Sequence, residues 1–254
     1  MQRSIRLKTI TGAVRRSGRM SVSQLQELTG ASAITIRRDL GELAEQGLLQ
    51  RVHGGADRAV RGARIPFGTR LASDRPTKQA LGAVVADLIG DGESIVIDNG
   101  TTCLAAAEAL APRPITALPL SLHTALALTG GQAEVILPEG PVERDTLALN
   151  SAGVLAAIGQ FRADTFIVGA CGASLDHGLT SETYADAAVK RAGFASASRT
   201  IMVSSGAKLG RSSAFSFAQA EDLSVLVTTS DAPADVVAGL RAAGVEVILV
   251  ATEV

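Results

Sequence analysis

Apolar residues near the N-terminus recur at helical spacing, in runs that end at glycines. The first run stops before Gly18 and consists of Ile5, Leu7, Ile10 and Val14. The second begins at Ser21, which has Gln24 three positions later, and ends at Gly30. A serine followed by a glutamine at that distance is a capping box, in which each side chain bonds to the backbone N–H of the other residue. These patterns predict two short helices.

A third helical pattern follows almost at once. Ser32 is a suitable N-cap, and one buried face ends before Gly47 and consists of Ile36, Leu40 and Leu43. Beyond it, an apolar run with a Gly-Gly turn predicts a strand that folds back, and this run contains Leu48, Leu49, Val52, Gly54 and Gly55. Helix, tight glycine turn, helix and hairpin in this order predict a winged helix-turn-helix.

From residue 75 onward, helical and strand-like patterns alternate. The expected helices are 78–89, 103–110, 154–161, 183–197 and 233–243, and the expected strands are 94–98, 115–120, 134–137, 165–168, 200–203, 224–227 and 245–250. Such alternation predicts a parallel sheet covered on both faces, so the fold class is α/β with a small N-terminal winged helix-turn-helix. Ligands of such sheets bind beyond the carboxyl ends of the strands.

A polar stretch separates the two patterns. Residues 57–78 read DRAVRGARIPFGTRLASDRPTK, and their glycines and prolines interrupt any continuous helix. A chain of 254 residues is long enough for two domains. We therefore expect a first domain over 1–57, a linker over 58–74 and a second domain over 75–254.

Charge divides the chain at the same place. Residues 1–58 contain ten Lys or Arg and five Asp or Glu, a net charge of +5, whereas the rest has 14 basic and 20 acidic residues, a net charge of −6. A basic domain joined to an acidic one indicates that the first meets a polyanion such as nucleic acid. A solvated helical surface would give the same charge count, so charge alone leaves both interpretations open.

Composition excludes several classes of protein. With 46% hydrophobic and 19% charged residues, the chain is not mainly disordered. Proline, histidine, glycine and glutamine interrupt the uncharged stretch 115–133, so we expect no membrane span. The N-terminus lacks the apolar core of a secretion signal, so we expect a cytoplasmic protein. Cys103 and Cys171 are interpreted as small buried residues, and no metal or cofactor is predicted.

The predicted third helix carries most of the candidate chemistry of the first domain. The candidate DNA-contacting residues are Ser32, Thr35, Arg37, Arg38, Arg51 and His53. The first turns of a recognition helix reach base edges, where arginine bonds guanine O6 and N7 together and threonine contacts a thymine methyl. The serine at the helix start and the two hairpin residues suit phosphate or minor-groove contacts. The alternative is a surface pair in which Arg37 and Arg38 bond to Asp39 or Glu42.

In the second domain, the sequence DNGTT at residues 98–102 follows a predicted strand and opens onto a predicted helix. Its glycine lets the backbone approach an anion, and the threonine hydroxyls and free N–H groups of the helix start can hold phosphate oxygens. Asn-Gly turns are also common connectors, so the loop alone does not identify a phosphate site.

Residues 21–56 read SVSQLQELTGASAITIRRDLGELAEQGLLQRVHGGA and resemble the N-terminal signature of the DeoR family of bacterial transcriptional regulators, above all in TIRRDL and RVHGGA. The resemblance continues along almost the whole chain, with DNGTT matching the family's D-x-G-T-T element and further matches at 178–180, 187–192 and 208–211. It implies an operator-binding winged helix-turn-helix joined to a sugar-phosphate-sensing domain similar in fold to ribose-5-phosphate isomerase.

This resemblance extends the set of candidate effector-binding residues. The set is Asp98, Asn99, Gly100, Thr101, Thr102, Ser121, Lys190 and Lys208. The two lysines are the cations expected against a phosphate. Asp186 lies one helical turn before Lys190, so the alternative for that lysine is an i,i+4 bridge on the surface.

Several presumed pocket positions depart from the family pattern. Leu118 and Pro119 lie in the segment where the family usually has Thr-Asn-Ser, and Glu139 stands at one of two expected glycines. Cys171, Ser174 and Ser205 stand where the family has aspartates. These departures leave the identity of the effector open.

We expect a transcriptional regulator, namely a repressor of carbohydrate-metabolism genes that a sugar phosphate releases from its operator. Because specific binding generally joins two half-sites, a homodimer or homotetramer is expected. The alternative hypothesis is a sugar-phosphate isomerase-like enzyme with an appended nucleic-acid-binding module. Isomerisation requires a positioned general base, and Cys171 and Ser174 replace the carboxylates of the isomerase-like segment, which argues against an enzyme.

Overall fold

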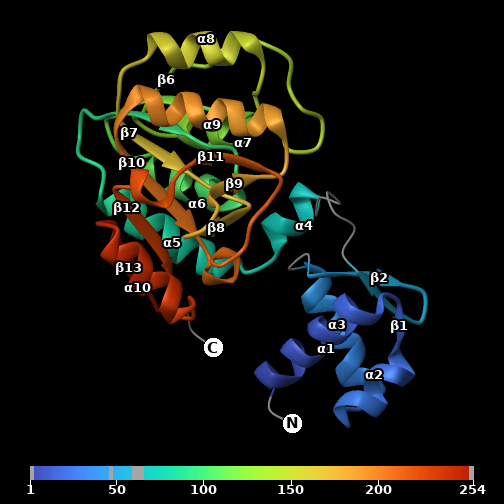
Figure 1. Cartoon of the computed structure of the whole chain (residues 1–254). Coiled ribbons are helices and arrows are strands. Elements are labelled where there is room, and N and C mark those ends of the chain that lie inside the picture. The colour runs from blue at the N-terminus through green and yellow to red at the C-terminus, as the bar shows by residue number, and fades with distance from the viewer. Residues whose placement is uncertain (1–2, 46–47, 59–65, 252–254) are drawn as a thin grey trace. The chain divides into compact units, whose positions relative to one another are not determined.

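The computed structural model describes residues 3–45, 48–58 and 66–251 and divides into two compact units (Figure 1). The head comprises residues 1–73 and the body residues 74–254. Of the stretch predicted as a linker, residues 59–65 lie outside the described part. A short helix that the sequence did not predict, α4 (Phe67–Ala72), forms within the same stretch.

The head is a winged helix-turn-helix, as predicted. Its elements are α1 (Arg3–Ser17), β1 (Met20–Ser21), α2 (Val22–Thr29), α3 (Ala33–Glu45), β2 (Leu49–Val52) and β3 (Gly55–Arg58). The three strands form an antiparallel sheet in the order β1-β3-β2. The two-residue strand β1 was not predicted, because it is too short to show alternation.

The three helices of the head enclose one small apolar core. Its fully buried members come from every helix and from the hairpin, and they are Ile10, Val14, Leu25, Ile36, Leu40, Leu43, Leu49 and Ala56. The stripe predicted for α3 therefore faces the core. Ile5, which was grouped with the first stripe, is exposed instead.

The body alternates helices and strands. In chain order it contains α5 (Arg75–Asp87), β4 (Ser94–Ile97), α6 (Thr101–Leu110), β5 (Thr116–Pro119), α7 (Leu122–Thr129), β6 (Glu134–Val135), α8 (Ala152–Gln160), β7 (Ala163–Val168), β8 (Gly172–Ser174), β9 (Gly178–Ser181), α9 (Tyr184–Ser196), β10 (Ala197–Ser204), η1 (Gly206–Lys208), β11 (Phe215–Ala218), η2 (Ala220–Asp222), β12 (Val225–Thr229), α10 (Ala234–Ala242) and β13 (Glu246–Val250). The predicted parallel sheet is confirmed, with seven strands in the order β13-β12-β10-β7-β4-β5-β6.

Successive residues of each sheet strand face opposite layers of helices. On β4, Ile95 and Ile97 pack with α5, α6 and α7. Val96, between them, packs in a second core with α8, α9 and α10. Figure 1 shows α8 and α9 running over the same side of the sheet. Burial on both faces explains why the sheet strands read as continuous apolar runs.

Two features of the body were not predicted. The helix α7 has the uncharged sequence LHTALALT, whose eight residues are too few to show a clear helical period. A small antiparallel sheet in the order β11-β9-β8 is built from strands of three or four residues, which read FSFA, GLTS and GAS. Strands this short show too little alternation of apolar and polar residues to be recognised in the sequence, so pairing within the fold and not local sequence determines this sheet.

Candidate nucleic-acid interface and effector site

A left-handed glycine and a serine cap join α2 to α3. Gly30 has φ of 69° and ends α2, a conformation that favours glycine. Ser32 Oγ accepts a hydrogen bond from the Thr35 N–H at 3.3 Å and lies 2.9 Å from Thr35 Oγ1. The predicted cap therefore forms, and it fixes the start of the candidate recognition helix.

The exposed face of α3 presents Arg37 and Arg38 away from the buried stripe. Asp39 Oδ2 lies 2.6 Å from Arg6 Nε, and Glu42 Oε2 lies 2.5 Å from Arg3 Nη2.

The two carboxylates considered as partners of the α3 arginines are thus bound to α1. Among the described residues, none forms an ion pair with Arg37 or Arg38. This arrangement favours the nucleic-acid interpretation over the surface pair.

The hairpin places two further candidates at the surface. Gly54 occupies the turn with φ of 76°. A Cβ on Gly55 would lie 2.0 Å from the Met20 carbonyl oxygen, so only glycine lets β3 approach β1 this closely. Arg51 on β2 and His53 in the turn are both exposed.

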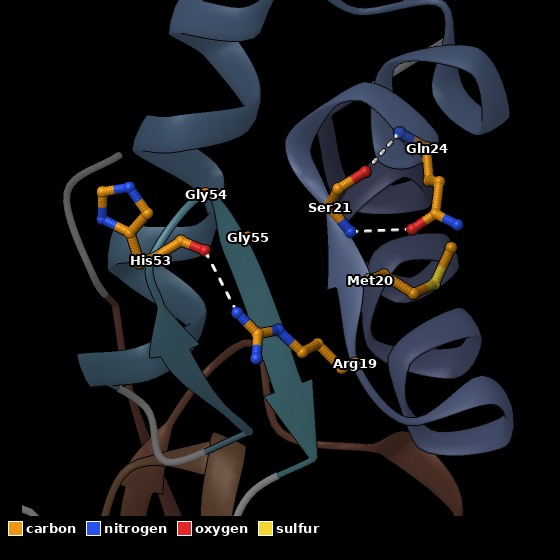
Figure 2. Close-up of a pocket in the computed structure, with 7 residues that line it drawn as sticks. All are labelled: Arg19, Met20, Ser21, Gln24, His53, Gly54 and Gly55. Atoms are coloured by element: carbon orange, nitrogen blue, oxygen red, sulfur yellow. Dashed lines mark hydrogen bonds between the residues drawn. The ribbon is translucent and has the colours of Figure 1, made fainter.

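Beside the turn, Figure 2 shows a hollow between the hairpin and the start of α2. It has a volume of about 280 Å³ and is lined by Arg19, Met20, Ser21, Gln24, His53, Gly54 and Gly55. The exposed Arg19 donates from Nη2 to the His53 carbonyl at 3.4 Å. The sequence analysis did not single out Arg19, although a basic residue just before a capping box was a usable signal for a surface cation near the turn. The capping box itself is confirmed, with Gln24 N–H donating to Ser21 Oγ and Ser21 N–H to Gln24 Oε1.

In the body, residues 98–102 lie where the strand order reverses. From β4 the chain proceeds to β5 and β6 on one side, and then returns to β7 on the other side of β4. Such a switch point is the usual place for a ligand in an open parallel sheet. Asp98 follows β4, and its Oδ2 accepts a hydrogen bond from the N–H of Gly169, just after β7, at 2.9 Å.

Lys190 lies between two carboxylates at this point. Its Nζ is 2.8 Å from Asp186 Oδ2 and 3.3 Å from Asp98 Oδ2. Asn99 Nδ2 donates to Asp186 Oδ1 at 3.1 Å, and Ser181 Oγ donates to Asp186 Oδ2. The i,i+4 bridge considered from the sequence is therefore present. It is buried and not on the surface, because the Lys190 side chain is 4% exposed.

The electrostatics of this cluster follow from one ammonium facing two acids. Burial would raise the pKa of Asp186, but Lys190 and the hydrogen bonds to the carboxylate lower it to about 2. Burial lowers the pKa of Lys190, and the two carboxylates more than reverse this effect. Burial raises the pKa of Asp98, Lys190 opposes the rise, and the charge of Asp186 adds to it. Asp98 Oδ1 is buried and accepts no hydrogen bond from the described residues.

Four other effector candidates lie at the start of α6 and in η1. Gly100 is the N-cap of α6, and Thr101 and Thr102 are buried in its first turn. Lys208, in η1, is half-buried. Burial and Asp98 raise the pKa of the Cys103 thiol, whereas Lys190 and Lys208 act to lower it.

Two serines serve local structure. Ser121 is fully buried and caps α7, with its Oγ accepting from the Thr124 N–H at 3.2 Å. Ser174 Oγ accepts from the His177 N–H at 3.2 Å in the turn between β8 and β9. Among the described residues, no group of three or more His, Cys, Asp or Glu side chains is placed to hold a metal ion.

Comparison with known proteins identifies the family. Residues 6–61 match the model of the DeoR-like helix-turn-helix domain, and residues 73–230 match that of the DeoR C terminal sensor domain. The chain belongs to the DeoR family. This DeoR-family chain is a DNA-binding transcriptional regulator and not an enzyme. The family resemblance and the fold class predicted from the sequence are thereby confirmed.

Several curated relatives span most of the DeoR-family chain. The transcriptional repressor AccR from Agrobacterium fabrum is 35% identical over 83% of each chain. The glycerol-3-phosphate regulon repressor from Escherichia coli is 30% identical, covering 93% of this chain and 94% of that protein. Among solved structures, ribose 5-phosphate isomerase A from Neisseria gonorrhoeae matches 52% of each chain at 14% identity with a TM-score of 0.37. In the described part of the chain, no helix is long and apolar enough to cross a membrane.

Proposed function

We propose that this protein is a cytoplasmic repressor of carbohydrate-metabolism genes, and that a sugar phosphate releases it from its operator. The observation that carries the proposal is the polar cluster around Asp98 at the switch point of the sensor sheet, in a chain whose head exposes Arg37 and Arg38. A relative named as a glycerol-3-phosphate regulon repressor supports the class of effector.

In the head, α3 reads bases and the residues around it bind phosphates. Arg37, Arg38 and Thr35 lie in the first turns of α3 and contact base edges in the major groove. The phosphate-binding set is Ser32, Arg51 and His53, to which the hollow beside the turn adds Arg19. Specificity therefore resides on α3 and affinity on the surface around it.

In the body, the two lysines have different roles. Lys190 already faces two carboxylates and is almost inaccessible, so it holds Asp98 and Asp186 in place. Lys208, together with the N–H groups of Gly100–Thr102 at the start of α6, binds the phosphate of the effector. An incoming dianion would meet Asp98 and Asp186 if it approached Lys190 instead, and like charges repel.

The free oxygen of Asp98 selects a hydroxyl group. Asp98 Oδ1 is buried without a hydrogen-bond partner among the described residues, which is costly unless a ligand satisfies it. A sugar hydroxyl both donates and accepts, so it can pair with this oxygen whether the acid is ionised or protonated. A ligand that places a phosphate at Lys208 and a hydroxyl at Asp98 belongs to the class of phosphorylated sugars or polyols.

The repressor works as a homodimer or homotetramer. One head covers only part of an operator, and two-fold symmetric dimers place two recognition helices on successive half-sites. The body offers the larger surface for association.

A thermal-shift screen tests the effector site. A ligand that binds only the folded state stabilises it by RT ln(1 + [L]/Kd), about 2.7 kcal/mol at one hundred times Kd. Among sugar phosphates and their unphosphorylated counterparts, at least one phosphorylated compound is expected to raise the melting temperature of the wild type. It should raise that of Lys208→Met much less. Equal stabilisation of both proteins would place the phosphate elsewhere.

A further inference from the structure

Among the described residues, two ion pairs join α1 to α3, three residues apart on each helix. Arg6 bonds Asp39 through two nitrogens, with Nε 2.6 Å from Oδ2 and Nη2 3.3 Å from Oδ1. Arg3 bonds Glu42 at 2.5 Å. The pairs differ in burial, because the Arg6 and Asp39 side chains are 13% and 3% exposed and those of Arg3 and Glu42 are 59% and 28% exposed.

The inner pair, Arg6–Asp39, constrains the rotation of α3 about its own axis more than apolar packing does alone. The stripe of α3 that faces the core is formed by leucine and isoleucine, and burial of such residues is not directional. A guanidinium that meets both oxygens of a carboxylate has one favoured geometry. The Arg6–Asp39 pair therefore adds a directional constraint on the rotation of α3 about its own axis.

That rotation determines where the exposed arginines of α3 lie. A helix with its side chains is about 10–12 Å across, so a rotation of about 10° moves its surface by roughly 1 Å. Binding groups must be held within about 0.5 Å of their productive positions. Arg38 is next to Asp39 in the chain, so any rotation that the pair prevents would displace its side chain.

We propose that the Arg6–Asp39 pair positions the recognition helix and thereby determines operator specificity without touching DNA. The inference rests on the proposed function, namely that α3 reads bases through Arg37 and Arg38. Arg6 itself is a poor candidate for a phosphate contact, since it is mostly buried and engaged with Asp39.

The test compares Arg6→Lys with Arg3→Lys in the full-length protein. Lysine keeps each positive charge but has no planar fork. Affinities are measured by fluorescence anisotropy at fixed salt for an operator selected from a random duplex library and for a scrambled duplex. The ratio of the two affinities, which spans about 10³ to 10⁷ in specific DNA-binding proteins, reports specificity.

For Arg6→Lys we expect the ratio to fall at least about tenfold, with the affinity for scrambled DNA and its salt dependence unchanged. Arg3→Lys, at the exposed pair, should change the ratio less than about twofold. Exchange of the inner pair, Arg6→Asp with Asp39→Arg, should recover part of the loss seen in Arg6→Asp alone. A structural role without an effect on base reading would not change the ratio in a folded variant.

Three results would overturn the inference. The first is an unchanged ratio in Arg6→Lys when circular dichroism shows a folded head. The second is an equal loss on both duplexes with a smaller salt slope, because this would make Arg6 a direct phosphate contact. The third is an unchanged ratio in the double variant Arg37→Ala with Arg38→Ala, because then α3 does not read bases through these arginines and that part of the proposed function fails as well. A loss in Arg38→Ala without one in Arg6→Lys refutes only the positioning role.

Discussion

Lys190→Met distinguishes a structural lysine from a phosphate-binding one. The substitution keeps a long side chain but leaves Asp98 and Asp186 buried without the ammonium that now lies 3.3 and 2.8 Å from them. Removing one partner of a buried ion pair costs about 3–5 kcal/mol. Asp98 can relieve part of this cost by binding a proton, since burial has already raised its pKa. We therefore expect a loss near the lower limit, about 3 kcal/mol.

Asp98→Asn is the matched control. It leaves Lys190 and Asp186 as a one-to-one pair at 2.8 Å, and the amide oxygen can still accept from the Gly169 N–H. The loss should be about 1 kcal/mol or less, in the range of one hydrogen bond. If Lys190 is structural, its removal must cost clearly more than that of its partner Asp98.

Urea unfolding of the full-length protein at pH 7, followed by circular dichroism, measures both losses. With a denaturant slope of about 2 kcal/mol/M, a loss of about 3 kcal/mol lowers the midpoint of the body transition by roughly 1.5 M. A Lys190→Met midpoint close to that of the wild type, together with lost effector binding, would refute the reasoning. It would show that the lysine is free to hold the phosphate.

Four further predictions concern DNA, assembly and pH. Arg38→Ala should cost about 1–3 kcal/mol in operator affinity, whereas Arg51→Ala should weaken specific and scrambled DNA alike, and gel shifts at fixed salt compare them. Arg19→Ala should reduce the slope of log affinity against log salt by about 1, and an unchanged slope would remove Arg19 from the phosphate contacts. Light scattering at micromolar concentration should give at least twice the chain mass of 26.0 kDa, so a monomer would contradict the symmetric model. The lowered pKa of Asp186, about 2, adds stability that is present above its ordinary pKa and is lost as pH falls from about 4 toward 2. In an acid titration, the Asp186→Asn variant should not show that part of the loss of stability.

Local signals explain why the head was predicted almost completely. The capping box at Ser21, the left-handed Gly30 and the stripe of α3 act within a few residues of sequence, so they are visible before folding. In the body, apolar runs alternating with helical patterns located most sheet strands for the same reason. The helix α7 was missed because an uncharged segment of eight residues is too short to show a distinctive period.

Contacts between distant segments account for what the sequence did not show. The i,i+4 spacing of Asp186 and Lys190 was visible, but Asp98 lies far away in sequence and reaches Lys190 only because β4 lies beside β7 beneath α9. This third member places the lysine between two buried carboxylates, which is the ground on which we propose a structural role for it. Arg6 and Asp39, 33 positions apart, likewise meet only in the folded head.

Titration of the protein–operator complex with an effector from the thermal-shift screen tests the proposed switch most directly. A ligand shifts the equilibrium between DNA-binding and released states only through unequal affinity for the two states, and a full reversal from 99:1 to 1:99 requires about 5.5 kcal/mol. The wild type and Lys208→Met should bind the operator equally well without ligand. The sugar phosphate should release the wild type and not the variant, whereas equal release of both proteins would contradict the assignment of the effector site.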